Sequence, residues 1–157
     1  MMENVDKDIP VLRDIIGPKE ELEYFGNNVL YGIGGEKVDM LCLHKKDGIR
    51  YRATAIELKK DSIDSGAVEQ IDRYSYWVSQ LATANATPRV YSLLLQPVLI
   101  GFDVRSDVIR LVERKKQRQI SIPYLWGECK VTLEPPVLLK YKVDSGKIEF
   151  EQKNIRV

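Results

Sequence analysis

The stretch IELKKDSIDSGAVEQIDRYSYWV, residues 56–78, is the most informative part of the sequence, because it leads from a strand into a helix. Its first residues end an apolar, partly alternating segment, Tyr51–Leu58, that is typical of a β-strand. Apolar residues then recur at helical spacing from Ser65 to about Ala82, and Ser65 is a favourable N-cap. We therefore predict a strand followed by the best-defined helix of the chain.

Two more strands are predicted before this stretch. Val29–Ile33 is short, whereas Lys37–His44 is almost wholly apolar. The turn signal Lys46-Asp47-Gly48 joins Lys37–His44 to Tyr51–Leu58, so we expect these two strands to form a hairpin.

Helices are predicted at the start of the chain and mostly strands at its end. Asp8 can cap a short helix that ends before Gly17-Pro18, and a second helix is predicted from Pro18 to Gly26-Asn27-Asn28. The remaining predicted segments are a strand over Arg89–Leu95 that Pro97 interrupts and that resumes to Phe102, a helix over Asp107–Lys116, and strands over Ile120–Trp126, Lys130–Leu133, Val137–Val143 and Ile148–Phe150. This order predicts a mixed α/β fold around a single sheet.

The composition bounds the class of protein. Of the 157 residues, 44% are hydrophobic and 30% are charged, which fits one globular domain over residues 1–157. The 24 Lys and Arg against 23 Asp and Glu leave a net charge of +1, so a site for a polyanion must be a local patch. Cys42 and Cys129 lie far apart, which excludes a disulfide scaffold or a Cys-rich zinc site. Without an apolar signal segment or membrane span, we expect a soluble, cytoplasmic protein with no membrane partner.

Acidic residues interrupt the two central predicted strands. Asp39 lies within the apolar segment Val38-Asp39-Met40-Leu41, and Glu57 lies near the end of the next strand. Because side chains alternate along a strand, Glu57 and Lys59 share one face, and in a hairpin Asp39 can lie beside Glu57. Two carboxylates at the edge of an apolar sheet repel each other, and a divalent cation relieves that repulsion. Mg²⁺ or Mn²⁺ prefers oxygen ligands, and a nearby lysine can hold the attacking water, so the set fits hydrolysis of a phosphodiester.

Surface ion pairs remain an alternative, because Glu-x-Lys occurs four times in the chain. Only Glu57 and Lys59 end an apolar strand and precede a strong helix. That helix adds Gln70 and Tyr74, which are four residues apart and share one face, and Gln70 lies near the N-terminus, where a helix favours anions. Core packing is the alternative for Tyr74 and the favoured interpretation for Trp77.

These motifs resemble the PD-(D/E)xK nuclease superfamily, most closely its RecB-type and NucS-like members. The matching residues, within about residues 18–100, are Asp39, Glu57, Lys59, Gln70 and Tyr74. Val38 stands where the motif has proline. The resemblance implies a restriction-endonuclease-like αβββαβ core, with a central mixed sheet flanked by helices, and leaves residues of about 103–157 as a β-rich C-terminal extension. It also implies Mg²⁺- or Mn²⁺-dependent cleavage of DNA, in DNA repair or recombination.

The resemblance further implies a role for each matching residue. These roles are metal binding by Asp39, Glu57 and the backbone carbonyl of Leu58, positioning or activation of water by Lys59, and shaping of the site by Gln70 and Tyr74. Many members add a glutamate from the first helix. On a helical wheel with Leu22 and Phe25 facing inward, Glu21 is the glutamate nearest that face, so it is the candidate fourth carboxylate. An ordinary exposed charge is the alternative for Glu21.

DNA binding needs cations that cluster. The candidate phosphate contacts flank the predicted hairpin turn, follow the motif lysine or lie on the two later helices, and they are Lys45, Lys46, Arg52, Lys60, Arg73, Arg110, Arg114 and Lys115. A solvated surface is the alternative for each of them.

Three functions stay open on the sequence: a nuclease, a non-catalytic nucleic-acid-binding module, and an assembly protein whose C-terminal part mediates oligomerisation. We favour the nuclease, because a site without chemistry has no physical reason to keep two carboxylates beside a lysine. Little of the chain beyond the core is available to read bases. We therefore expect structure-selective cutting, a homodimer, or a protein partner that confers specificity.

Overall fold

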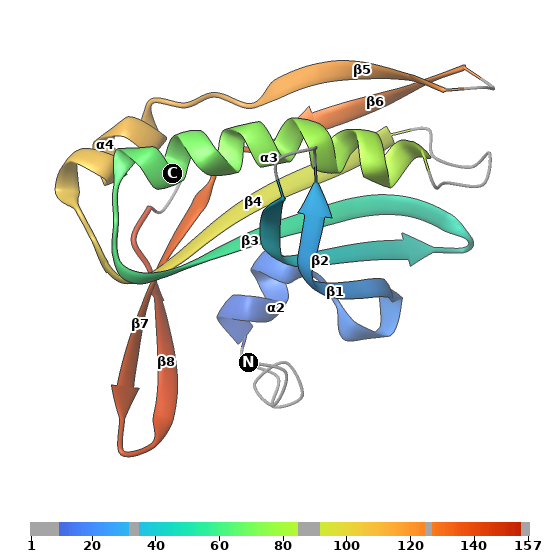
Figure 1. Cartoon of the computed structure of the whole chain (residues 1–157). Helices are drawn as coiled ribbons and strands as arrows, with labels where there is room; N and C mark the ends of the chain where they lie inside the picture. The colour runs from blue at the N-terminus through green and yellow to red at the C-terminus, as the bar shows by residue number, and fades with distance from the viewer. Residues whose placement is uncertain (1–9, 32–34, 85–91, 125–126, 155–157) are drawn as a thin grey trace.

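The computed structural model describes residues 10–31, 35–84, 92–124 and 127–154, which form one large sheet with helices on both sides (Figure 1). The elements follow one another as α2 (Pro10–Ile16), η1 (Lys19–Glu21), β1 (Leu22–Tyr31), β2 (Glu36–Lys46), β3 (Ile49–Ile63), α3 (Ser65–Ala84), β4 (Ser92–Val104), α4 (Ser106–Glu113), β5 (Arg118–Tyr124), β6 (Gly127–Leu133), β7 (Val137–Asp144) and β8 (Lys147–Gln152). The predicted order of helix, three strands, helix and strand is confirmed.

The sheet is mixed. Its strands lie in the order β1-β2-β3-β4-β6-β5, with β7 beside the second half of β4 and β8 beside β7. The pairs β1–β2 and β2–β3 are antiparallel, whereas β3–β4, β4–β6 and β4–β7 are parallel. This arrangement confirms the mixed α/β class with a central mixed sheet flanked by helices.

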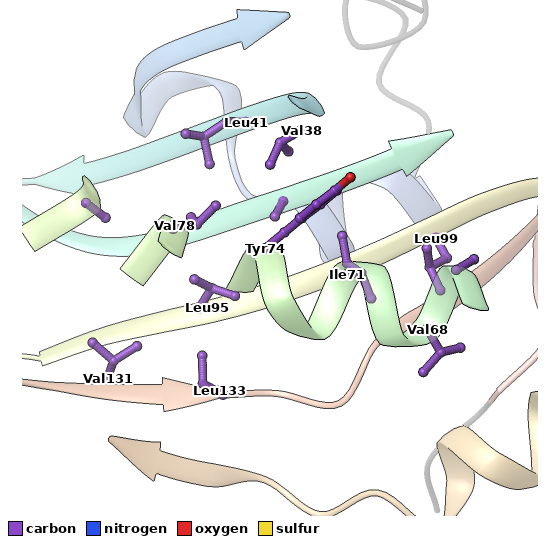
Figure 2. Close-up of a cluster of buried hydrophobic side chains, with 14 of the residues drawn as sticks. Val38, Leu41, Val68, Ile71, Tyr74, Val78, Leu95, Leu99, Val131 and Leu133 are labelled. Atoms are coloured by element: carbon purple, nitrogen blue, oxygen red, sulfur yellow. The ribbon is translucent and has the colours of Figure 1, made fainter. Parts of the chain in front are cut away.

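The larger part of the core lies under α3. This helix crosses β3 and β4 and buries the side chains of Val68, Ile71, Tyr74 and Val78 against them (Figures 1 and 2). The spacing of three to four residues places these side chains on one helical face, so the amphipathic pattern of the sequence is what seats the helix.

A second, smaller core lies on the opposite face of the sheet. There Leu12, Ile15 and Ile16 of α2 pack against Met40 and Ile56 of the two central strands. The β7–β8 hairpin borders this face and extends away from the rest of the molecule (Figure 1). Alternate residues of the central strands thus serve two cores, as their nearly continuous apolar sequence requires.

The predicted helix over Pro18 to Asn28 is wrong. Only the short η1 is helical, and Leu22 begins β1, which pairs with β2 from Leu22 opposite His44 to Tyr31 opposite Glu36. The charged KEELE segment has good helix formers, but pairing along β2 satisfies more backbone groups and buries more apolar surface than an isolated turn of helix.

The predicted interruption at Pro97 is also wrong, because β4 continues through it. Pro97 falls between the section of β4 that pairs with β6, ending at Leu95, and the section that pairs with β7, beginning at Val98. A proline lacks the N–H that a ladder uses, and here it occupies a position where the neighbouring strand changes. The predicted residues Asp8, Ile33, Arg89 and Trp126 lie outside the described part of the chain.

Candidate active site

The structure brings Asp39 and Glu57 together at the end of the β2–β3 ladder. The last pair is Met40 opposite Ile56, so Asp39 and Glu57 occupy the next position along the two strands. Asp39 Oδ2 accepts a hydrogen bond of 2.7 Å from the backbone N–H of Leu58. The side chain of Asp39 therefore continues the connection between the strands beyond the point where the ladder ends.

Glu57 is a buried acid, with 5% of its surface exposed. Burial raises the pKa of Glu57, the negative charge of Asp39 raises it further, and the hydrogen bond from Lys59 acts in the opposite direction. Oε1 accepts that bond, whereas Oε2 is buried without a hydrogen-bond partner in the described part of the chain. A buried carboxylate oxygen of this kind costs folding free energy unless something binds it.

Lys59 connects the strand to the helix. Its Nζ lies 3.0 Å from Glu57 Oε1 and 2.7 Å from Gln70 Oε1. The amide nitrogen of Gln70 in turn donates to the hydroxyl of Tyr74, whose ring reaches from α3 toward the strands (Figure 2). Gln70 and Tyr74 lie one turn apart on α3, so the helical spacing lets both side chains join one series of hydrogen bonds that ends at Lys59.

A bulge in β3 follows directly after Lys59. The register with β4 shifts between Lys59 opposite Gly101 and Ser62 opposite Asp103. A side chain on residue 101 would approach to 2.7 Å of Ile63 and to 3.1 Å of the Asp61 carbonyl, so glycine permits the bulged strand to pass close to β4. The bulge ends the regular alternation and leaves Lys59 and Lys60 lining the same surface.

That surface is a groove of about 590 Å³, which we call the hairpin groove because β7 and β8 supply part of its wall. Polar groups line it at Asn27, Asn28, Asp39, Lys59 and Lys60. Apolar and aromatic side chains make up the rest, namely Met40, Leu58, Ile100, Tyr141, Ile148 and Phe150. Tyr141 and Phe150 belong to the C-terminal extension, and no motif of the sequence assigns them a role.

Glu21 does not join this site. It lies in η1, where it accepts a hydrogen bond from the Tyr51 hydroxyl and lies 3.7 Å from Lys46 Nζ. Lys46 and Tyr51 flank the turn of the β2–β3 hairpin, and Asp39 and Glu57 lie at the opposite end of that ladder. The helical wheel misplaced Glu21 because the segment is not an α-helix.

The predicted DNA-binding cations are spread over the molecule. Lys60 alone among them lines the hairpin groove. Lys45 and Lys46 lie beside the distant turn, and Lys115 forms an ion pair of 2.5 Å with Asp72. The other exposed candidates, on or just after the two later helices, are Arg73, Arg110 and Arg114.

Arg52 has a structural role that the sequence did not suggest. Its guanidinium donates a hydrogen bond to the Ile15 carbonyl, and the Thr54 hydroxyl donates one of 3.1 Å to the Ile16 carbonyl. Both side chains therefore cap carbonyls at the C-terminal end of α2. His44 is buried next to Gly17, at the same end of that helix. Arg52 and Thr54 therefore hold the end of α2 on the sheet, and His44 is buried beside them.

The donor set fits a hard divalent cation. Asp39, Glu57 with its unpartnered Oε2, and the carbonyl of Leu58 offer the oxygen ligands that Mg²⁺ and Mn²⁺ prefer. The described residues hold no group of three or more His, Cys, Asp or Glu side chains close enough to bind a metal. A cation here would thus take two carboxylates and complete its coordination with backbone, water or phosphate oxygens.

No family model and no curated protein matches the chain. Among solved structures, a repair endonuclease from Pyrococcus abyssi is similar to it, with a TM-score of 0.43 and 20% sequence identity. The similarity covers 73% of this chain and 42% of that one, so the chain spans less than half the length of the endonuclease. The similarity concerns the course of the backbone alone.

In the described ranges, no helix is long and apolar enough to cross a membrane.

Proposed function

We propose that this chain is a metal-dependent DNA nuclease that hydrolyses phosphodiester bonds and selects its substrates by structure. The observation that carries the proposal is the environment of Glu57. The carboxylate of Glu57 is buried, one of its oxygens has no hydrogen-bond partner in the described part of the chain, and the other forms an ion pair with Lys59. The carboxylate of Asp39 adds a second negative charge nearby. This arrangement costs folding free energy, and a bound cation would stabilise it.

Some groups of the site would bind the metal ion, and others would orient the ligands that bind it. Asp39, Glu57 and the Leu58 carbonyl would hold Mg²⁺ or Mn²⁺. When bound, the ion supplies Lewis acidity to the attacking water and to the phosphodiester. The Asp39 bond to the Leu58 N–H fixes the first carboxylate, and the Lys59 bond fixes the second.

Lys59 supplies the remaining group. An ammonium has three N–H donors, and two of them are used by Glu57 and Gln70 within the described residues. The third donor is free to hold the water or a phosphate oxygen, where a fixed positive charge stabilises the developing negative charge. Gln70 accepts a hydrogen bond from Lys59 and donates one to Tyr74, so it fixes the position of the Lys59 ammonium group.

The test is incubation of the purified protein with single-stranded, duplex and branched DNA, with Mn²⁺ or with EDTA. We expect cleavage with Mn²⁺, none with EDTA, and a loss of about 10³-fold or more in Asp39→Ala and Glu57→Ala. Glu57→Gln, which keeps the shape of the side chain, separates loss of the ligand from loss of the fold.

The matched control is Glu151→Ala, which removes an exposed glutamate that has the same lysine two residues later. It should cut DNA at the rate of the unchanged protein. Persistent cutting by folded Glu57→Ala would refute the proposal. Salt-sensitive DNA binding that ignores the chelator and yields no products would instead indicate a binding module.

A further inference from the structure

The hairpin groove has two chemically different parts. At one end Asp39, Lys59 and Lys60 join it to the proposed catalytic site. The rest of its lining is apolar and includes the aromatic residues Tyr141 and Phe150 beside aliphatic side chains. Phosphates interact with the first kind of surface but gain nothing from the second, so the apolar part requires a different portion of the substrate.

The aromatic wall is built by the pairing of β7 and β8. Tyr141 lies opposite Phe150 in the antiparallel ladder. Phe102 of β4 packs edge-on against Tyr141, with ring centroids 5.9 Å apart, and the Tyr141 hydroxyl donates to the Lys60 carbonyl over 3.4 Å. Neighbours on two other strands therefore hold Tyr141 in place, while it lines the groove.

We infer that the hairpin groove binds an unpaired nucleobase of the DNA strand whose phosphate lies at Asp39 and Lys59, an inference that rests on the nuclease function proposed above. A base stacks on an aromatic ring irrespective of its identity, and amide groups such as those of Asn27 and Asn28 can meet its polar edge. A volume of about 590 Å³ lies within the range of sites that bind small organic groups.

Fully paired DNA is not the ligand that fits the hairpin groove best. In a duplex both faces of a base are covered by its neighbours, so only a base that is single-stranded, frayed or extruded can stack on protein. Charge supports the same occupant, because Lys59 and Lys60 stand where the phosphates flanking that base would lie. The substrate class is therefore single-stranded DNA or DNA with an unpaired nucleotide.

The test measures binding in EDTA, where the proposed reaction cannot proceed. Single-stranded oligonucleotides with one 2-aminopurine report stacking through their fluorescence, and a matched duplex carries no unpaired base. We expect the double variant Tyr141→Leu/Phe150→Leu to bind the single strand at least about tenfold more weakly and to lose the fluorescence change, with duplex binding altered less than about twofold.

Three single variants keep the test decisive if the double variant unfolds. Phe150→Trp enlarges the stacking surface and should bind the single strand as tightly as the unchanged protein or more tightly. Tyr76→Leu removes an exposed aromatic ring from α3, outside the groove, and should change nothing. Lys60→Met should lower the slope of log affinity against log salt by about 0.7.

Equal binding of single strand and duplex, or an unchanged fluorescence signal in the double variant, would overturn the inference. So would a dimer that forms without DNA and that the double variant dissociates, because a second copy of the chain would then occupy the groove. Mn²⁺-dependent cutting is measured separately on the same variants. If cutting persists while stacking is absent, the nuclease stands and only the nucleobase site fails.

Discussion

Two Glu-x-Lys motifs of this chain each form an ion pair within themselves, one in β3 just beyond its ladder with β2 and one at the end of β8. Lys59 Nζ lies 3.0 Å from Glu57 Oε1, and Lys153 Nζ lies 2.6 Å from Glu151 Oε1. The glutamate side chain is 7% exposed in the first pair and 52% exposed in the second. The same sequence pattern thus gives a pair with a buried glutamate on an inner strand and a solvated pair on the terminal hairpin.

The two glutamates respond to their surroundings in opposite ways. Burial raises the pKa of Glu57, whereas the hydrogen bond from Lys153 lowers the pKa of Glu151. Around Glu57 the fold adds a second carboxylate, Asp39, while around Glu151 it adds the positive charges of Lys140 and Lys142. Neighbours from other strands and from α3, not the motif itself, therefore give the two glutamates their different properties.

DNA cleavage should separate the two motifs most strongly. Lys59→Met should slow cleavage about 10²- to 10³-fold, because it removes the positive charge that the proposed mechanism uses to hold the water or a phosphate oxygen. Lys153→Met should leave the rate within about twofold, since its ion pair is exposed and worth little. Initial rates on one radiolabelled substrate with Mn²⁺ measure both. Equal losses in the two variants would remove the distinction between the motifs.

A second expected effect concerns stability against pH without metal. A raised pKa in the folded state means that Glu57 stabilises the protein below its ordinary pKa and that this contribution is lost as the pH rises. Glu57→Gln should therefore gain stability over the unchanged protein between pH 4.5 and 7, by at most about 1.4 kcal/mol per pH unit. Urea unfolding in EDTA at several pH values measures this difference.

Glu151→Gln provides the opposite sign. Its lowered pKa means that Glu151 stabilises the folded state above the ordinary pKa and that the contribution is lost as the pH falls. The variant should be the less stable protein at pH 7 and should approach the unchanged protein in acid. Parallel pH profiles for Glu57→Gln and Glu151→Gln would contradict the assignment of the buried site.

The smallest expected effect is that of the tyrosine behind the lysine. Tyr74→Phe removes the hydroxyl that accepts from Gln70 but leaves the Gln70 bond to Lys59. One hydrogen bond contributes about 0.5–1.5 kcal/mol, so cleavage should fall about two- to tenfold. Tyr76→Phe, on the exposed side of α3, is the matched control and should show the full rate. A Tyr74→Phe protein with the full rate would show that the chain of contacts ends at Gln70.

The strand and helix that carry the site were predictable because their signals are local. The turn at Asp47 and Gly48, both with positive φ, has the two-residue geometry that the sequence indicates, and the helix over Ser65–Ala84 follows its apolar spacing. The β1 segment was not predictable in this way, because pairing with β2 outweighs the helix propensity of KEELE. Glu21 was misassigned for the same reason.

The aromatic wall of the hairpin groove was missed although the sequence contains a signal for it. The turn at Ser145 and Gly146 closes a two-residue hairpin, and counting outward from Asp144 opposite Lys147 places Tyr141 opposite Phe150. The sequence could have given this pair. It could not have given the contact of Tyr141 with Phe102 and Lys60, which lie far away along the chain.

By itself the sequence determined which side chains share a face. Alternation along a strand joins Glu57 to Lys59, and the helical turn joins Gln70 to Tyr74, because both periods are properties of a single segment. It did not determine which residue faces Asp39. The turn alone would place Ile56 there, but a bulge at Tyr51 shifts the register by one residue and brings Glu57 opposite. Only the tertiary structure fixes that shift and the burial of Glu57, since both depend on packing between segments that are distant in the chain.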